Sequence, residues 1–121
     1  MLTVLVADDE FAVLEVLSMA LEGEGHRVLK AGDGADALRI LVGQACDVVV
    51  VDEMMPMMSG HQLIEAMRAD PRLAQLPVIM MAESWGKQLP ALPGAVVMGK
   101  PIRLGELFEH VVRLGNARRQ P

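Results

Sequence analysis

The sequence predicts one α/β domain, in which a doubly wound, five-stranded parallel sheet carries helices on both faces. Three observations support this fold class. Short apolar runs alternate along the chain with longer stretches of helical periodicity. Alternating strands and helices favour a parallel sheet, whose strands are apolar on both faces. The length of 121 residues fits one domain and leaves no room for a second.

Two strand-helix units account for the start of the chain. Residues 2–7 form an apolar run that is too short for a buried helix. Acidic residues follow, where they favour the start of a helix over residues 11–22, and Gly23 ends that helix. Residues 26–31 form the second strand. A Gly-Asp-Gly turn then leads to a second helix over residues 35–42, which has its own apolar stripe.

The third and fourth strands enclose one more helix. Residues 47–51 are the expected third strand. A helix with apolar residues on one face begins at Ser59 and ends at Asp70, because the next residue is a proline. Residues 77–82 form the fourth strand.

The segment 83–94 is irregular at the place where a fourth helix is expected. Three residues disfavour a helix there, namely Gly86, Pro90 and Pro93. We therefore expect a shortened or missing fourth helix. Residues 95–99 then form the fifth strand, and a last helix over residues 104–114 closes the domain.

The composition excludes several classes of protein. The formal net charge of −5 argues against direct binding of nucleic acid, and the only basic cluster is Arg118-Arg119. No apolar stretch approaches the ~20 residues of a membrane span. The N-terminus shows no secretory signal, and the single cysteine, Cys46, cannot form an internal disulfide. These features favour a cytoplasmic location.

Charged residues follow three of the predicted strands. The first strand is followed by Asp8 and Asp9, the third by Asp52, and the fifth by Lys100. Because functional sites of parallel α/β sheets lie outside the carboxyl ends of the strands, we expect these side chains to lie together. An isolated acid would be costly to leave unpaired there. The pattern predicts a divalent cation and a phosphoryl group held at one sheet edge.

Three motifs give the chain a resemblance to a known family. They occur in order, with strand-helix units between them: the acidic pair Asp8-Asp9, the motif Asp52-x-x-Met55-Pro56-x-Met58-x-Gly60, and the pair Lys100-Pro101. With these motifs the chain resembles, from end to end, a receiver domain of the two-component response regulators, of the single-domain chemotaxis type. The resemblance implies a flavodoxin-like strand order of 2-1-3-4-5, a receiver domain over residues 1–115 and a short tail over residues 116–121.

The resemblance also implies a function. It identifies Asp52 as the acceptor of a phosphoryl group from a sensor histidine kinase, a phosphotransfer protein or a small acyl phosphate. The chain would then signal through contacts with a further protein, without binding nucleic acid or a membrane. It would not be an enzyme, beyond promoting its own phosphorylation and dephosphorylation.

The chemistry of the motif residues agrees with these roles. The carboxylate of Asp52 can accept a phosphoryl group as an acyl phosphate. Attack on an anionic phosphoryl group needs positive charge, and Mg²⁺ is the natural ion because it prefers oxygen ligands. By resemblance, Asp9, Asp52 and the backbone carbonyl of Met54 bind Mg²⁺, and Asp8 acts through water. Lys100 pairs with Asp52 and later with a phosphoryl oxygen, and a cis peptide bond precedes the next proline. Each residue also has a plainer interpretation, as a strand-end acid, a helix-start acid or a solvent-facing lysine.

Two positions depart from the family pattern. The fourth strand normally ends in Ser or Thr, whose hydroxyl binds the phosphoryl group, but this chain has Ala82. Ser84, two residues further on, would supply this hydroxyl only if the end of the strand shifted. The fifth strand often has an aromatic residue three positions before the lysine, and this chain has Val97. We therefore expect intact phosphorylation chemistry and an altered conformational readout.

Other residues have modest interpretations. Four methionines, at positions 54, 55, 57 and 58, match a loop that packs on the site better than a Cu(I) site. Gly60 is expected to relieve crowding where this loop becomes a helix. Trp85 lies beside the expected site. We interpret it as a lid, as a contact for a partner, or as a cover for the core that the lost helix leaves exposed. No ligand spacing joins the three histidines, His26, His61 and His110.

Two alternative functions remain open. The first is a degenerate receiver that binds its partner constitutively, which Ala82 and Val97 favour and the intact motif residues oppose. The second is a small α/β phosphotransfer enzyme or cofactor carrier. A flavodoxin would need a Gly-rich, hydroxyl-rich loop after the first strand to bind the phosphate of its cofactor. This chain has Asp8 and Asp9 there, which would repel phosphate. A haloacid-dehalogenase-type phosphatase would need its acidic pair separated by one residue after the first strand, whereas the pair Asp8-Asp9 is contiguous here.

Overall fold

Five parallel strands form the sheet at the centre of the molecule. The computed structural model describes residues 1–83, 92 and 94–119. The strands are β1 (Thr3–Ala7), β2 (Arg27–Ala31), β3 (Val48–Asp52), β4 (Val78–Ala82) and β5 (Ala95–Gly99). All neighbouring pairs are parallel, and the order is β2-β1-β3-β4-β5. This confirms the predicted fold class and the strand order that the resemblance implied.

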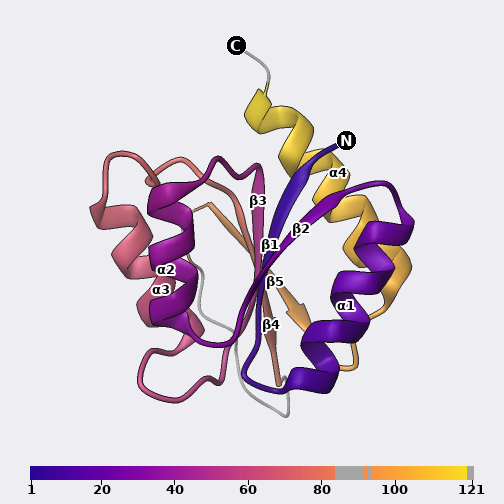
Figure 1. Cartoon of the computed structure of the whole chain (residues 1–121), viewed down its shortest axis with the longest axis horizontal. Coiled ribbons are helices and arrows are strands. Elements are labelled where there is room, and N and C mark those ends of the chain that lie inside the picture. The colour runs from indigo at the N-terminus through magenta and orange to yellow at the C-terminus, as the bar shows by residue number, and fades with distance from the viewer. Residues whose placement is uncertain (84–91, 93, 120–121) are drawn as a thin grey trace.

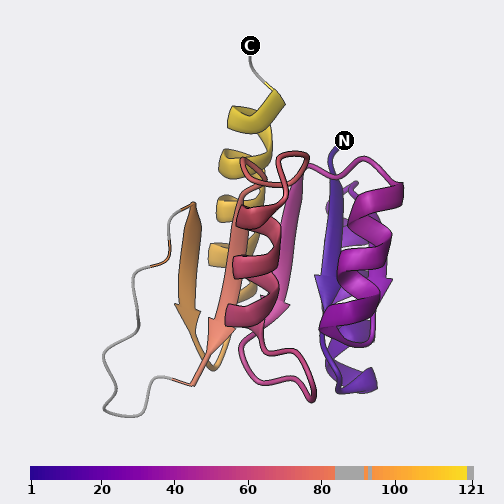
Figure 2. The same cartoon turned by 90° about the vertical axis from the view of Figure 1, so that its left-hand side faces the viewer.

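Helices cover both faces of the sheet. The described helices are α1 (Phe11–Gly23), α2 (Gly34–Gly43), α3 (Gly60–Ala69) and α4 (Leu104–Arg119). Figure 1 shows α2 and α3 on one side of the sheet and α1 and α4 on the other. In Figure 2, α2 and α3 lie in front of the strands. The sheet is therefore doubly wound, as expected for right-handed strand-helix-strand connections.

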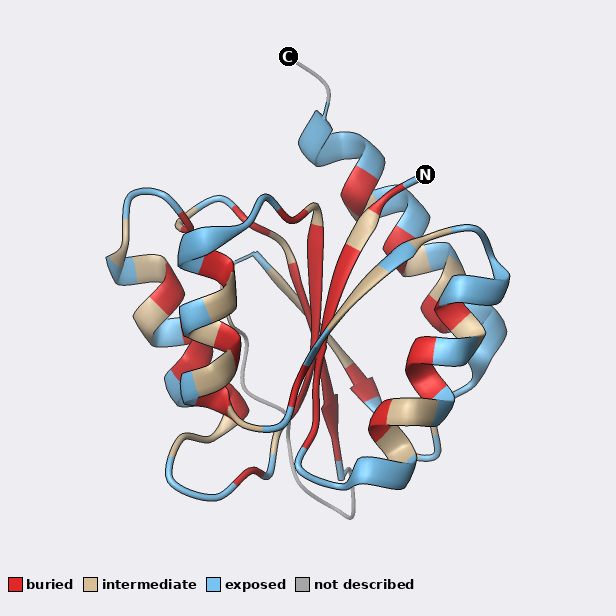
Figure 3. Cartoon of the chain, viewed as in Figure 1, coloured by how far each residue is buried: buried red, intermediate tan, exposed pale blue. Residues whose placement is uncertain are grey.

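Alternation along each central strand divides the core into two layers. Val49 and Val51 of β3 belong to the cluster under α2 and α3, whereas Val48 and Val50 belong to the cluster under α1 and α4. Every residue of β3 and β4 is buried, as the central red strands in Figure 3 show. This burial explains why these strands read as continuous apolar runs.

Side chains define the starts of α2 and α3. The Asp33 carboxylate accepts a hydrogen bond from the backbone N–H of Asp36 at 2.7 Å. Ser59 and Gln62 form a reciprocal capping box, in which each side chain accepts a hydrogen bond from the other residue's backbone N–H. These caps fix the two helix starts within a residue of the predicted positions.

The last helix extends beyond its predicted end at residue 114. It continues to Arg119, so residues 116–119, expected in the tail, are helical. The guanidinium of Arg119 forms two hydrogen bonds of 2.8 Å with the carboxylate of Asp47. The same carboxylate accepts a hydrogen bond from the backbone N–H of Thr3 at 2.8 Å. The contact between Arg119 and Asp47 holds the final turn of α4 against the sheet. Because Asp47 lies far from Arg119 in the sequence, helical periodicity did not predict this longer helix.

The predicted loss of a helix after β4 falls mostly on residues 84–91 and 93, which lie outside the described residues. Ser84 and Trp85 lie there too. The described residues of this connection, Glu83, Leu92 and Gly94, are not helical. Among the described helices, none is long and apolar enough to span a membrane.

Candidate functional site

The carboxyl edge of the sheet brings the predicted acids together. Asp8 follows β1, and Asp52 is the last residue of β3, the neighbouring strand. Asp8, Asp9 and Asp52 each offer a carboxylate oxygen, and these three oxygens lie within 4.8 Å of one another. Asp8 and Asp52 are buried, whereas Asp9 is exposed. The topology thus assembles the acidic cluster that the strand ends predicted.

Lys100 supplies a positive charge to this cluster. Its Nζ lies 2.6 Å from Oδ1 of Asp52. Its backbone N–H donates a hydrogen bond to the carbonyl of Ala82 at 2.9 Å, and the peptide bond between Lys100 and Pro101 is cis. Partial burial acts to lower the pKa of Lys100, but the hydrogen bond and charge of Asp52, with the charges of Asp8 and Glu83, raise it above its usual value. The lysine therefore remains charged.

Asp8 experiences the opposite balance. Burial raises its pKa, and the negative charges of Asp52 and Asp9 add to this effect. A hydrogen bond of 2.9 Å from the backbone N–H of Glu10 and the charge of Lys100 act against it. The ionised carboxylate is therefore less stable here than in water. A cation beside it would lower this pKa.

The cluster fits a hard divalent cation. It contains three carboxylates and one ammonium group, so negative charge is in excess. Closely spaced carboxylate oxygens are the ligands that Mg²⁺ uses, with water and few protein groups completing its coordination. Burial, and then the charges of Asp52 and Asp9, raise the pKa of Asp8 despite the positive charge of Lys100, so a further cation would favour its ionised form.

The loop after Asp52 makes a close turn into α3. A Cβ at Gly60 would lie 2.7 Å from the carbonyl oxygen of Asp52, so only glycine fits without displacing this backbone. The N–H of Gly60 donates to the carbonyl of Glu53 at 2.9 Å. The predicted role of Gly60 in relieving crowding is confirmed.

The four methionines of this loop do not point to one site. Met55 is buried in the core, and Met58 packs so closely against Gly34 that a Cβ there would lie 2.8 Å from its side chain. Met54 and Met57 are exposed, and Met57 has a φ of 69°. This division matches a loop that packs on the core and on α2 through Met55 and Met58.

The two unusual positions lie where the sequence placed them. Ala82 is the buried last residue of β4 and pairs with Gly99 of β5. Val97 is half-buried in β5 and packs against the core under α3. Neither side chain offers a hydroxyl group or an aromatic ring to the site.

One contact near the site was not anticipated. Nε2 of His61, in the first turn of α3, lies 3.1 Å from Oε2 of Glu53, the residue after Asp52. The only signal in the sequence is that each residue neighbours a motif residue.

The single cysteine has no reactive role in the site. Cys46 is buried and its pKa is raised to about 11, chiefly by desolvation, so this thiol remains protonated.

Comparison with known proteins gives a consistent result. The profile of the response regulator receiver domain family matches residues 4–111. The probable transcriptional regulatory protein TcrX of Mycobacterium tuberculosis is 43% identical over 79 residues, which are 65% of this chain and 33% of that protein. Protein PilH of Pseudomonas aeruginosa is 32% identical over 95 residues, which are 73% of this chain and 78% of PilH. The chain thus spans about a third of TcrX and most of PilH.

Solved structures agree in fold. The chemotaxis protein CheY4 of Vibrio cholerae is 26% identical with a TM-score of 0.83, and the match covers 94% of this chain and 98% of CheY4. A response regulator receiver domain protein of Clostridium thermocellum has a TM-score of 0.85 at 23% identity, with 98% of each chain covered. The second likeness concerns the fold alone.

Proposed function

Because the chain belongs to the response regulator receiver domain family, we propose that it receives a phosphoryl group on Asp52 and signals by binding another protein. The observation that carries this proposal is the ion pair between Lys100 Nζ and Asp52 Oδ1, 2.6 Å long, beside the carboxylates of Asp8 and Asp9. Receiver domains are signalling modules that interact with histidine kinases or phosphotransfer proteins. We propose a sensor histidine kinase, a phosphotransfer protein or a small acyl phosphate as the donor here.

In the proposed reaction, a carboxylate oxygen of Asp52 attacks the phosphorus atom of the donor. The bond from phosphorus to the leaving atom breaks, the leaving group takes the electron pair, and an acyl phosphate forms on Asp52. Lys100, already charged and directed at Asp52, pairs with a phosphoryl oxygen as negative charge develops there. Phosphoryl transfer depends mainly on such positioning and charge.

The acidic residues have a separate role in this proposal. Mg²⁺ held by Asp9, Asp52 and the backbone carbonyl of Met54, with Asp8 acting through water, would supply further positive charge at the phosphoryl oxygens. Asp8 keeps the pocket negative, and therefore selective for a cation, in the free state. We place the receiver unit over residues 1–115, although α4 continues to Arg119. We propose a cytoplasmic location, with no nucleic-acid or membrane partner.

A direct test is phosphorylation by acetyl phosphate with Mg²⁺, followed by intact-mass spectrometry. One phosphoryl group should be added to the wild type and none to Asp52→Asn. The control is Asp36→Asn, which removes a half-buried acid on α2 that pairs with Arg39. Phosphorylation that survives in Asp52→Asn would place the acceptor elsewhere and refute the proposal.

A second function, constitutive partner binding with vestigial phosphorylation, is favoured by one observation. The buried end of β4 carries the methyl group of Ala82 where a hydroxyl would contact the phosphoryl group. Binding of the isolated partner protein, measured with and without beryllofluoride and Mg²⁺, distinguishes the two functions. Equal affinity in both states supports the constitutive module.

A further inference from the structure

An apolar pocket adjoins the charged site. It has a volume of about 490 Å³ and lies between α1 and the residues that follow β5. That volume lies within the range of small-molecule sites. Asp8 and Lys100 line the pocket, so it is continuous with the proposed phosphorylation site. Its apolar wall includes Val13, Val16, Leu17, Met81, Pro101 and Ile102.

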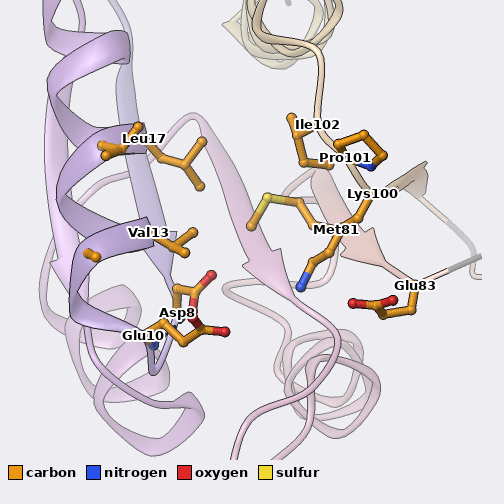
Figure 4. Close-up of a pocket in the computed structure, with 11 residues that line it drawn as sticks. Asp8, Glu10, Val13, Leu17, Met81, Glu83, Lys100, Pro101 and Ile102 are labelled. Atoms are coloured by element: carbon orange, nitrogen blue, oxygen red, sulfur yellow. Dashed lines mark hydrogen bonds between the residues drawn. The ribbon is translucent and has the colours of Figure 1, made fainter.

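The pocket combines two kinds of chemistry. Figure 4 shows the amine of Lys100 extending toward Asp8 across the pocket, with Val13 and Leu17 of α1 on the side of Asp8 and Met81 of β4 on the side of Lys100. Such a wall fits a ligand with an anionic head beside Lys100 and an uncharged apolar body. Glu10 and Glu83 also line the pocket. Their charges disfavour a second anionic group on that body.

We infer that this pocket receives the acyl chain of an acyl phosphate donor, so that donors with a short apolar chain react faster than acetyl phosphate. This inference rests on the proposed phosphorylation of Asp52. In the transfer, an Asp52 oxygen forms a bond to phosphorus while the bond from phosphorus to the acyl oxygen breaks. The carboxylate leaves with the electron pair, and no proton moves.

The position of the pocket suits this leaving group. In an in-line displacement, the leaving oxygen lies on the side of phosphorus away from the attacking carboxylate. Asp8 and Lys100 line the pocket, but Asp52 does not. A chain attached to the leaving oxygen therefore extends past Lys100 toward the apolar wall. After transfer, the acids at the rim repel the carboxylate product and favour its release.

The test compares acetyl, propionyl and butyryl phosphate, whose leaving groups are carboxylic acids of nearly equal acidity. The whole chain with Mg²⁺ is mixed with each donor at the same subsaturating concentration, and the rate is followed by intact mass. Complete burial of one methylene group corresponds to about a four-fold gain. We expect butyryl phosphate to react at least about five-fold faster than acetyl phosphate, since its two added methylenes are partly buried.

Variants of the pocket wall connect the preference to this surface. Val13→Phe fills the pocket and should reduce the butyryl-to-acetyl ratio to about one. Met19→Phe is the matched control, because Met19 is exposed on the same helix and does not line the pocket. Ile102→Thr, across the pocket, should lower the ratio about two-fold by removing apolar surface, and it serves if Val13→Phe does not fold.

The outcomes separate this inference from the function on which it rests. If acetyl phosphate labels Asp52 but the wild-type ratio is about one, or the ratio is unchanged in both wall variants, the pocket does not select the donor and only this inference fails. If no acyl phosphate labels the wild type, this inference fails and a kinase or phosphotransfer protein stays the proposed donor. If labelling persists in Asp52→Asn, the proposed function itself fails.

Discussion

Lys100 Nζ lies 2.6 Å from Asp52 Oδ1, although 48 positions separate the two residues in the sequence. The strand order explains this proximity, since β4 alone lies between β3 and β5. Their carboxyl ends therefore open onto the same edge. The pair places a cation where negative charge would develop during transfer to Asp52.

The first prediction concerns this lysine. Lys100→Met should lower the rate of phosphorylation by acetyl phosphate about 100-fold, because one preorganised charge at the transferring group is lost. Mg²⁺ binding should persist, since the carboxylates remain. The rate is measured by intact mass and binding by calorimetry. Lys30→Met, which removes an exposed lysine paired with Glu15, is the control and should react normally. A normal rate in Lys100→Met would contradict the assigned role.

The second prediction concerns Mg²⁺. A ligand that binds only the folded state adds about 2.7 kcal/mol to the free energy of unfolding at 100 times its Kd. Saturating Mg²⁺ should therefore raise the melting temperature, and a chelator should reverse the change. Asp9→Asn should abolish the increase, whereas Asp36→Asn should retain it. Calorimetry that shows unchanged Mg²⁺ binding in Asp9→Asn would remove Asp9 from the proposed ligands.

The third prediction concerns the pH dependence of the contact between Asp47 and Arg119. Burial acts to raise the pKa of Asp47, but the hydrogen bonds from Arg119 and Thr3 outweigh it and lower the pKa below its usual value. A carboxyl group with a lowered folded-state pKa stabilises the fold above its ordinary pKa of about 4. This stabilisation is lost as the pH falls through the lower, folded-state value.

Asp47→Asn should therefore reduce the free energy of unfolding at pH 7 by about 1 kcal/mol, since the Arg119 side chain is half exposed. The difference from the wild type should shrink toward zero below the lowered pKa. Urea unfolding across this pH range measures both effects. A difference that is independent of pH would show that the charge on Asp47 does not contribute.

The fourth prediction concerns Ser18 of α1. Its Oγ is buried and has no hydrogen-bond partner among the described residues. Ser18→Ala removes an unsatisfied hydroxyl and improves helix propensity, so it should raise the free energy of unfolding by about 1 kcal/mol. Ser59→Ala is the counterpart, because it removes the capping hydroxyl of α3 and should lower stability by about 1 kcal/mol. Destabilisation by Ser18→Ala would reveal a partner for the hydroxyl, such as water.

Local sequence signals account for most of the fold and for the main site. Strands that are buried on both faces read as uninterrupted apolar runs, so β3 and β4 were predictable. Parallel pairing then forces the residues that follow each strand to one edge. Asp8, Asp52 and Lys100 could therefore be placed together without any knowledge of side-chain contacts.

Contacts between distant side chains could not be predicted in this way. The end of α4 depends on the contact between Arg119 and Asp47, 72 residues apart. Similarly, Arg68 of α3 donates to the carbonyl of Gly94, just before β5. No periodicity, cap or motif in the sequence encodes such pairs, because Arg119, Asp47 and Arg68 each resemble an ordinary surface charge.

The last prediction concerns Ala82, the residue that most distinguishes this site. Ala82 is buried at the end of β4, and its carbonyl accepts a hydrogen bond from the N–H of Lys100. A hydroxyl at this position would donate a hydrogen bond to a charged phosphoryl oxygen, worth roughly 1.5–3 kcal/mol. Because a ligand shifts an equilibrium only by its differential affinity, the wild type should respond weakly to beryllofluoride in β5 and α4.

Ala82→Thr and Ala82→Val test this directly, since the two side chains have nearly the same shape and only threonine has a hydroxyl. Beryllofluoride with Mg²⁺ should bind Ala82→Thr about ten-fold to a hundred-fold more tightly than Ala82→Val. Amide NMR shifts over residues 95–119 should grow in Ala82→Thr alone, though only partly, because Val97 offers no ring to move with the hydroxyl. Equal affinities in the two variants, or a large wild-type shift across these residues, would show that the readout does not depend on a hydroxyl at position 82.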